Sequence, residues 1–249
     1  VTAKQVTDSY TTVTLRADGQ GINRDDVGYE LNPFCEIAIE EAVRIIEDDA
    51  DDGEVVAVCI GSDDATKEVR SALAIGADRG ILVECDEEKL DSDIVAQMLV
   101  KICQTEQPNL VILGKQATDG DSNQVGQLLA EYMGWPQATF AYKVEVNEGL
   151  DGATVQREVD GGVETVEIQF PAVITTDLRL NEPRSAGLFG IKRARKKPLD
   201  VTTPEELGVA MQPKVETVSF GVPSKRKAGV IVGSVDELIE KLANEAKVI

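Results

Sequence analysis

Histidine is missing from this chain of 249 residues, and aromatic residues make up only 4% of it. Histidine is the side chain that most often exchanges protons near neutral pH, so its absence excludes His-dependent triads, His-based acid/base catalysis and nearly all structural zinc sites. The motifs G-x-x-x-x-G-K-[ST] and G-x-G-x-x-G are missing too. ATP hydrolysis and ordinary dinucleotide binding therefore lack their usual loops.

Basic residues are also scarce. The chain has 25 Lys and Arg against 45 Asp and Glu, a net charge of −20 and a pI near 4.4. Binding of nucleic acid or of an anionic membrane by the whole surface is not expected, because such binding needs clustered cations. A charge of this size fits a cytoplasm of high salt, where repulsion is screened.

Long hydrophobic runs are absent, since no stretch approaches the roughly 18 to 20 apolar residues that span a bilayer, and no signal peptide is recognisable. The four cysteines, Cys35, Cys59, Cys85 and Cys103, form no C-x-x-C pair, and three lie in or beside apolar segments. Buried, reduced thiols are the better interpretation, and a disulfide is the alternative. We expect a cytoplasmic protein without direct membrane insertion. Val1 to Val6 looks like the second half of a strand, so we expect a few residues before it.

What is present is a regular alternation of strands and helices. Apolar runs at 54–60, 80–83 and 110–113 predict strands buried on both faces, and apolar stripes predict helices from Asn32-Pro33 to about 47, over 65–73 and from 91 or 92 to 102. After Trp135-Pro136, alternating patterns at 141–146, 154–159 and 163–170 predict antiparallel strands with one solvated face. The chain therefore has an α/β fold with a parallel sheet between helices and a few antiparallel strands.

The loop from Gly114 to Gln127 follows the apolar strand at 110–113 and precedes a helical stripe. A helix start at the carboxyl end of a strand presents free backbone N–H groups, which suit a phosphate. Asp121 is predicted to cap this helix, with Gln124 in capping-box spacing. The alternative is an ordinary polar β-to-α loop. Asp119 and Asp121 are better explained as a solvated and a capping carboxylate than as an acid/base pair, so we assign no catalytic residue.

Two charged segments are candidates for further sites. The acidic tract 48–52 is a solvated turn rather than a metal site, because nothing in it imposes a coordination geometry, and we assign no metal ligand. Residues 179–197 have neither a helical nor a strand period and carry seven basic residues against Glu182. They form either a solvated loop or a docking surface for an acidic partner. Beyond Pro198 we expect turns, a strand at 215–220, an apolar stretch at 229–232 and a final helix from Ser234.

Several motifs resemble the β subunit of electron transfer flavoprotein and follow one another in the order of that family. They are Asn32-Pro33-Phe34-Cys35-Glu36-Ile37-Ala38, Glu40-Glu41-Ala42-Val43-Arg44, Ala77-Asp78-Arg79-Gly80, Gly114-Lys115-Gln116-Ala117, Asn123-Gln124, Trp135-Pro136-Gln137, Val155-Gln156-Arg157, Asp160-Gly161-Gly162-Val163-Glu164, Pro171-Ala172-Val173-Ile174-Thr175 and Asp177-Leu178-Arg179-Leu180-Asn181-Glu182-Pro183-Arg184. They cover nearly the whole chain, so chance agreement is implausible.

The resemblance implies a three-layer, Rossmann-like fold of the adenine nucleotide alpha hydrolase-like type. It implies a nucleotide-binding domain at 1–178, a recognition loop at 179–198 and a C-terminal arm at 199–249 that contacts an α subunit. FAD would be held by or shared with that α subunit, and AMP would be bound in this chain as a structural group. The AMP-binding residues carried over by position are Thr2, Asn32, Pro33, Phe34, Cys35, Ile60, Gly114, Lys115, Gln116, Ala117, Thr118, Asp119, Gly120, Asp121, Ser122, Asn123, Gln124 and Val125.

Two positions depart from many family members: Thr2 replaces Ala, and Val125 replaces a Thr whose hydroxyl could hold the phosphate. A phosphate contact through backbone N–H would survive the second change. Phe34 matches a flavin-facing position of the family, and Tyr10 would substitute for a flavin-facing Tyr expected at Ser9. Leu188 matches the Leu that anchors dehydrogenases in the recognition loop.

The resemblance implies an electron carrier rather than an enzyme. Electrons would pass from acyl-CoA dehydrogenases and other flavoprotein dehydrogenases, through FAD, to electron transfer flavoprotein-quinone oxidoreductase, as in fatty acid β-oxidation. One alternative is the bifurcating type, in which β holds a second FAD instead of AMP. The other is an adenine-nucleotide-binding module of another class, which would need no α partner.

Overall fold

The computed structural model describes residues 1–25, 27–48, 53–225 and 228–249, so most of the acidic tract, residues 49–52, lies outside it. The chain divides into two units, which are described separately. The first unit contains residues 1–14 and 23–217, and the second contains residues 15–22 and 218–249.

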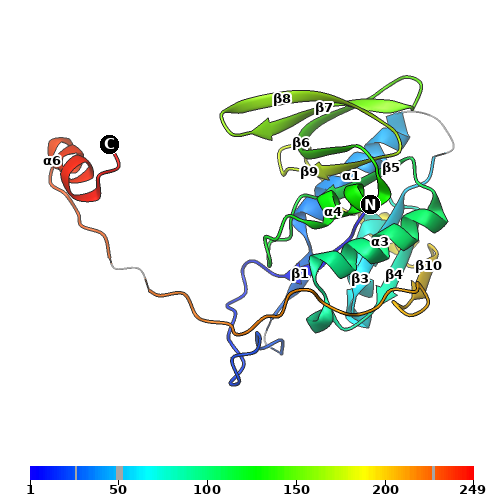
Figure 1. Ribbon diagram of the computed structural model, residues 1–249, viewed down its shortest axis with the longest axis horizontal. Coiled ribbons are helices and arrows are strands. Elements are labelled where there is room, and N and C mark those ends of the chain that lie inside the picture. Colours follow the sequence, from blue (N-terminus) through cyan, green and yellow to red (C-terminus); the bar gives the residue numbers. More distant parts are fainter. Residues whose placement is uncertain (26, 49–52, 226–227) are drawn as a thin grey trace. The chain divides into compact units, whose positions relative to one another are not determined.

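The first unit begins with the alternating strands and helices expected from the sequence (Figure 1). Its first elements are β1 (Gln5–Thr7), β2 (Tyr29–Leu31), α1 (Pro33–Asp48), β3 (Val56–Gly61), α2 (Thr66–Ile75), β4 (Arg79–Glu84), α3 (Ser92–Glu106), β5 (Leu110–Gly114) and α4 (Val125–Met133). The predicted start of α1 at Pro33 is confirmed. So is the predicted cap of α3, because Asp91 accepts a hydrogen bond from the backbone N of Ile94 at 2.8 Å.

The remaining elements of the first unit are the antiparallel part and the segment after it, which includes the predicted recognition loop. They are β6 (Gln137–Val146), β7 (Gly152–Val159), β8 (Gly162–Gln169), β9 (Ala172–Thr176), α5 (Leu188–Ala194) and β10 (Leu199–Thr202). The three predicted antiparallel strands are present as β6, β7 and β8. The sequence did not predict the strand β2, the helix α5, which lies within a segment expected to have no regular structure, or the strand β10.

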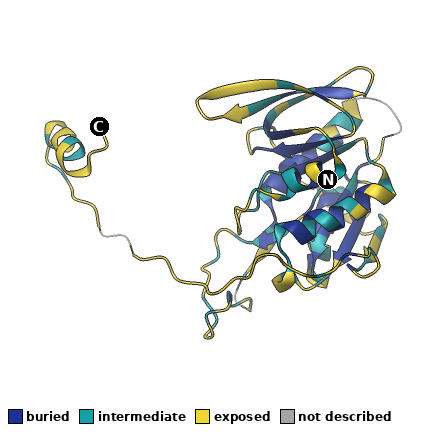
Figure 2. Ribbon diagram, in the orientation of Figure 1, coloured by how far each residue is buried: buried dark blue, intermediate teal, exposed yellow. Residues whose placement is uncertain are grey.

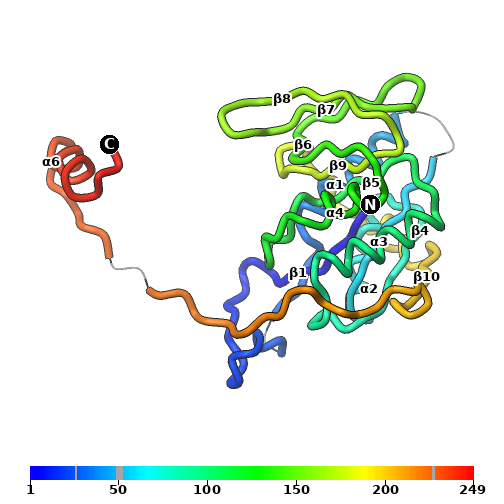
Figure 3. The backbone as a smooth tube through the Cα atoms, in the orientation of Figure 1, coloured from blue at the N-terminus to red at the C-terminus, as the bar shows by residue number. Residues whose placement is uncertain are grey.

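The strands form two larger sheets and one small one. The first larger sheet has the order β10-β4-β3, all parallel, and the second has the order β5-β9-β6-β7-β8. In the second, β9 is parallel to both β5 and β6. Residues 1–3 run parallel to β3 through a bridge from Thr2 to Val58, a path that Figure 3 traces from the N-terminus to β1. The mixed α/β fold with parallel strands and a few antiparallel ones is confirmed.

Alternate residues of β3 explain why helices cover both faces of the first sheet. Ala57 and Cys59 pack with the apolar sides of α1 and α2, whereas Val58 packs with those of α3 and α4. A third cluster joins α1 to the inner face of β5 to β9. Figure 2 shows this burial in the strands and in α1, and the exposed outer parts of the β7–β8 hairpin. Burial on both faces is the usual condition of parallel strands, as the apolar runs predicted.

The second unit pairs a short turn with the C-terminal segment. Leu15 bridges Ile22 around Gly19, and the backbone N of Phe220 donates to the carbonyl of Gly19 at 2.9 Å. The predicted final helix is present as α6 (Val235–Lys241), capped by Ser234, and a π-helical turn follows over Leu242–Ala246. The strand expected at 215–220 is wrong, since these residues form no strand.

Candidate functional site

The turn before α1 and the loop after β5 are joined by one buried side chain. Asn32 is only 1% exposed, and its Nδ2 donates to the carbonyl of Gln116 at 2.9 Å. Its Oδ1 accepts from the backbone N of Thr118 at 3.3 Å. The side chain therefore ties two chain segments together rather than only starting a helix. Both segments belong to the predicted nucleotide site.

Gly114 lets the same two segments approach each other closely. A Cβ at this position would lie 2.6 Å from Cβ of Phe34 and 3.0 Å from the backbone N of Cys35. Real Cβ atoms do not come so near to backbone atoms, so any side chain would push the loop away from α1. Glycine is therefore required by the contact between the end of β5 and the start of α1.

The start of α4 differs from the prediction. Asp121 does not cap it: Asp121 has a positive φ of 48°, and its Oδ1 accepts from Nε2 of Gln116 at 2.8 Å. The residue before α4 is Gln124, which offers no side-chain cap. The first N–H groups of a helix have no partner within it, so those of α4 are available to an anion.

The carboxylates of this loop are partly neutralised. Lys4 Nζ lies 2.7 Å from Oδ2 of Asp119, and the predicted Asp121 is held within the loop as described above. Asn123 also has a positive φ, 49°, and accepts a hydrogen bond from Gln127 at 3.0 Å. A glycine cradle, uncapped helix N–H groups and paired carboxylates fit a phosphate group. The residues present therefore fit a nucleotide bound through its phosphate.

The remaining predicted nucleotide residues lie near the same strand ends. The Thr2 hydroxyl is 3.7 Å from Sγ of Cys35, which also accepts from Nδ2 of Asn32 at 3.4 Å. Ile60 is the second-last residue of β3, and it packs with Val125 against the cluster between α3 and the sheets. Gly120 and Ser122 are exposed at the tip of the loop. The structure thus brings Thr2, the 32–35 turn and the base of the loop into one region.

Lys115 has a role that the sequence did not reveal. Its Nζ donates to Oδ2 of Asp177 at 2.7 Å and lies 5.5 Å and 5.0 Å from the ring centroids of Phe34 and Phe140. Besides lying in the predicted nucleotide loop, Lys115 therefore binds Asp177 just after the end of β9. Asp177 could have been noticed, because it directly follows a buried parallel strand, where ligand-binding residues of open sheets gather. Phe140 sits in an irregularity of β6 with a φ of 60° and gave no such signal.

The two residues predicted to face the flavin lie in different settings. Phe34 is buried, and Tyr10 is 97% exposed in the connection between β1 and β2. The backbone N of Tyr10 donates to Oδ1 of Asp8 at 2.9 Å. An exposed ring on a polar turn is free to contact a second chain. Both assignments remain predictions.

The predicted recognition loop, residues 179–198, is held at its base by two glutamates of α1, the buried Glu40 and the exposed Glu47. Arg184 Nε lies 2.8 Å from Oε2 of Glu40, and the two guanidinium NH groups reach Glu47 at 2.7 Å each. Burial alone would raise the pKa of Glu40, but hydrogen bonds from Arg184 and Arg44 more than offset it and lower that pKa below its ordinary value. Glu40 is therefore ionised and fixes Arg184. Leu188, beyond this anchor, is 86% exposed.

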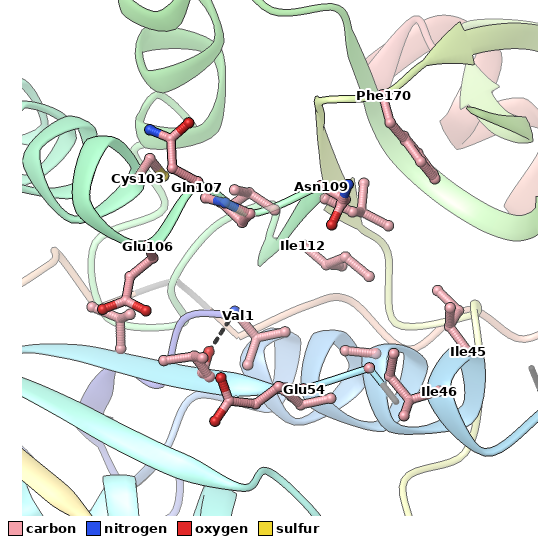
Figure 4. Close-up of a pocket in the computed structure, with 18 of the residues that line it drawn as sticks. Val1, Ile45, Ile46, Glu54, Cys103, Glu106, Gln107, Asn109, Ile112 and Phe170 are labelled. Atoms are coloured by element: carbon pink, nitrogen blue, oxygen red, sulfur yellow. Dashed lines mark hydrogen bonds between the residues drawn. The ribbon is translucent and has the colours of Figure 1, made fainter. Parts of the chain in front are cut away.

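A cavity of about 480 Å³ lies at the other end of the strands (Figure 4). Its walls include the start of β3, the start of β5 and the end of α3, where Arg79 pairs with Glu54 and Glu106. The amino group of Val1 donates to the carbonyl of Val56 at 2.9 Å beside it. Among the described residues predicted to bind nucleotide, Thr2 alone lines this cavity. The cavity and the 114–125 loop therefore lie at opposite ends of the parallel strands.

Burial makes two of the cysteine thiols unreactive. All four cysteines are free, and Cys35, Cys59 and Cys103 are buried, as the sequence predicted. Burial raises the pKa of Cys59 to about 12 and the pKa of Cys103 to about 11, so both remain protonated near neutral pH. The described part of the chain contains no cluster of three or more His, Cys, Asp or Glu placed to hold a metal ion. It also contains no helix of the length and apolarity needed to cross a membrane.

Comparison with known proteins adds an independent line. The family model described as "Electron transfer flavoprotein domain" matches residues 21–207. The chain is 48% identical over 249 residues to "Electron transfer flavoprotein subunit beta, mitochondrial" of Arabidopsis thaliana, covering 100% of this chain and 98% of that protein. It is 49% identical over 249 residues to "Electron transfer flavoprotein subunit beta" of Bradyrhizobium diazoefficiens, with the same coverage. The human protein of that name is 45% identical over 245 residues, covering 97% of this chain and 95% of its own length.

Proposed function

The chain belongs to the electron transfer flavoprotein family as a β subunit, and from this membership we propose that it forms a heterodimer with an α subunit. The heterodimer carries electrons on FAD from acyl-CoA dehydrogenases and other flavoprotein dehydrogenases to a quinone oxidoreductase. FAD, held by or shared with the α subunit, supplies the redox chemistry. The residues of this chain bind, position and dock, and none of them makes or breaks a bond. We place the complex in the cytoplasm, in keeping with the free thiols.

AMP is the group that we assign to the 114–125 loop. Backbone N–H groups at the start of α4 would hold its phosphate, with Asn32 and Gly114 fixing the loop against α1. Because those donors are backbone groups, Val125 in place of Thr leaves them intact. AMP here would order the ends of β3 and β5 and take no part in electron transfer.

Nucleotide content tests this assignment directly. We expect the purified heterodimer, denatured and resolved by chromatography, to release one FAD and one AMP. Release of two FAD and no AMP would instead identify a bifurcating protein. A colourless chain that folds without a second subunit would indicate an adenine-nucleotide-binding module of another class.

The observation that carries the proposal of an electron carrier is the exposure of Leu188 on an anchored segment. A transient carrier must dock quickly and release quickly, which a small interface with one pocketed apolar side chain and charged surroundings allows. Leu188 is 86% exposed, although the recognition loop is fixed at its base by Arg184. An exposed leucine on a fixed base is suited to insertion into a partner.

The substitution Leu188→Ala tests this role. We expect slower electron transfer from acyl-CoA dehydrogenase to the heterodimer, with FAD content unchanged. Normal kinetics with the dehydrogenase would overturn the assignment of Leu188.

We assign the C-terminal arm, residues 199–249, to contact with the α subunit. Its last part displays apolar side chains to solvent, including Val222 at 78% and Ile231 at 99% exposure. Apolar side chains gathered on one segment at this exposure are typical of a surface that a partner covers. We expect Ile231→Asp to reduce the yield of heterodimer during co-purification, whereas Glu240→Gln on α6 should leave the yield unchanged.

A further inference from the structure

Phe189 directly follows Leu188 and is almost as exposed, at 84% against 86%. The chain has only five phenylalanines, and Phe189 is the most exposed of them; the next, Phe220, is 44% exposed. An aromatic ring in water forgoes the burial energy that makes phenylalanine a core residue. Two such side chains in succession indicate a surface that is covered when the protein works.

The inner face of α5 explains why these two side chains point outward. A Cβ on Gly190 would lie 2.8 Å from the carbonyl O of Ala74 in α2, and Ala194, four residues on, is only 2% exposed. Residues four apart share one face of a helix, so the Gly190 and Ala194 face is the one pressed onto α2. On a period of 3.6 residues, Leu188 and Lys192 lie on the opposite face, and Phe189 and Arg193 lie on a flank.

Hydrogen bonds at the C-terminal end of α5 fix this helix against α2. Arg70 Nη1 donates to the carbonyls of Ala194 and Lys197 at 2.7 Å each. Lys197 Nζ in turn donates to the carbonyls that end α2, including that of Ala77 at 2.5 Å. With Arg184 fixing the other end on Glu40, the segment is held on both sides of the exposed pair. A docking surface that is already ordered loses little entropy when a partner binds.

The charge around the pair selects the kind of partner. Four exposed cations lie on and just after α5, in a chain whose net charge is −20: Lys192, Arg193, Arg195 and Lys196. A positive rim around an apolar centre complements a protein surface of the reverse design, with carboxylates around an apolar pocket. It also steers such a partner toward this face of an otherwise acidic molecule.

We propose that Phe189 is a second apolar anchor beside Leu188, and that the partner surface is an apolar pocket wide enough for both side chains and rimmed by carboxylates. This inference rests on the proposed function, because it concerns the same docking surface. It adds a residue that sets the shape of the pocket, and hence which dehydrogenases are accepted. The packing of Gly190 and Ala194 on α2, together with the hydrogen bonds of Arg70, holds the two anchors in fixed positions.

The test compares purified heterodimers carrying Phe189→Ala, Leu188→Ala, both changes or neither. Binding to an acyl-CoA dehydrogenase is measured by the dissociation constant, and electron transfer is measured by KM and kcat. We expect Phe189→Ala to raise the dissociation constant and KM roughly tenfold, with little change in kcat, which is the effect of removing one well-packed anchor. Phe189→Leu should recover part of this loss because it restores apolar contact.

A matched control is Val163→Ala on β8, where Val163 is 58% exposed and lies outside both the recognition loop and the C-terminal arm. This variant should bind the dehydrogenase as the unaltered protein does. FAD and AMP content and the yield of heterodimer should be unchanged in all variants, since neither anchor is buried in the subunit.

The possible outcomes separate this inference from the proposed function. If Leu188→Ala weakens binding and Phe189→Ala stays within twofold of the unaltered protein, the second anchor is wrong and the docking surface stands. If neither substitution weakens binding, the docking role of the recognition loop falls, and the second anchor falls with it. If Phe189→Ala lowers the yield of heterodimer, Phe189 belongs to the subunit interface, which also overturns the inference.

Discussion

The 114–125 loop and the recognition loop, which we propose bind a resident group and a transient partner, are built in opposite ways. The first is held by backbone contact: Gly114 touches the start of α1, and the buried amide of Asn32 bonds to the loop. The second is held at its base by Arg184, which pairs with the buried Glu40, and it displays apolar side chains outward. A permanently bound group requires backbone atoms in precise positions, whereas a transient partner requires exposed side chains on a segment that is held in place. Substitutions should therefore affect stability in the first region and docking in the second.

The largest effect is expected at Gly114. Gly114→Ala would place a Cβ 2.6 Å from Cβ of Phe34 and 3.0 Å from the N of Cys35, so the loop and α1 must separate. We expect the free energy of unfolding in urea to fall by about 2 to 3 kcal/mol, with loss of AMP. The control is Gly120→Ala in the same loop, where the nearest atom would be 3.8 Å away, and stability should not change. Equal stability of the two variants would contradict the close contact.

A smaller loss is expected at the base of the recognition loop. Arg184→Met keeps the aliphatic stem but removes the guanidinium from Glu40, which is 1% exposed and keeps its pair with Arg44 at 2.6 Å. We expect a loss of about 2 kcal/mol in the free energy of unfolding, less than for a fully unpaired buried charge. We also expect weaker binding of the dehydrogenase, because the segment that carries Leu188 is loosened.

The control for Arg184 is Lys67→Met, which breaks an exposed pair with Asp64 at 3.7 Å. Exposed pairs contribute little, so this variant should stay within about 0.5 kcal/mol of the unaltered protein. If Arg184→Met were equally mild, the ionic base would not be what holds the recognition loop.

The pH dependence of stability sharpens the same point. The pKa of Glu40 is lowered in the folded state, so its ionised form stabilises the fold above the ordinary value of 4.5 and this contribution is lost as pH falls through the lowered pKa. Glu47, which shares Arg184, shifts in the same direction, whereas burial raises the pKa of Glu41 beside them. We expect the stability difference between the unaltered protein and Glu40→Gln to be largest near pH 6 and to shrink below pH 4.5. A constant difference in urea titrations from pH 7 to pH 3 would contradict this.

Local sequence signals predicted the region around the 114–125 loop well. Asn32-Pro33 begins α1, Asp91 caps α3, and the strands before the loop are buried on both faces. What failed there was the cap at Asp121. Capping-box spacing is a local pattern, and it cannot show that Gln116 bonds to this carboxylate or that the backbone adopts a positive φ. Lys115 was placed correctly in the loop, but its partner Asp177 is 62 residues away and was not found.

The recognition loop and the segments after it were harder to predict, again for physical reasons. The helix α5 packs a glycine and an alanine against α2, so it has no apolar stripe, and its leucine and phenylalanine face solvent. The strand β10 has four residues and exists through parallel pairing with β4, more than 115 positions earlier in the chain. Residues 215–220 alternate like a strand but form none, because strand propensity describes packing against a neighbour. Leu188, whose docking role stays a prediction, is exposed, and the sequence did not single out Phe189 beside it.

The smallest effect on stability is expected for the two docking residues themselves. Leu188 and Phe189 are more than four-fifths exposed, so truncating both to Ala removes almost no buried surface, and alanine is a better helix former than either. We expect the free energy of unfolding of the double variant to stay within about 0.5 kcal/mol of the unaltered heterodimer, in the same urea titration that shows the large loss at Gly114. A loss as large as that for Arg184→Met would mean that Leu188 and Phe189 are packed within the heterodimer. The contrast between a loop held by buried backbone contacts and a loop that displays its side chains to solvent would then not hold.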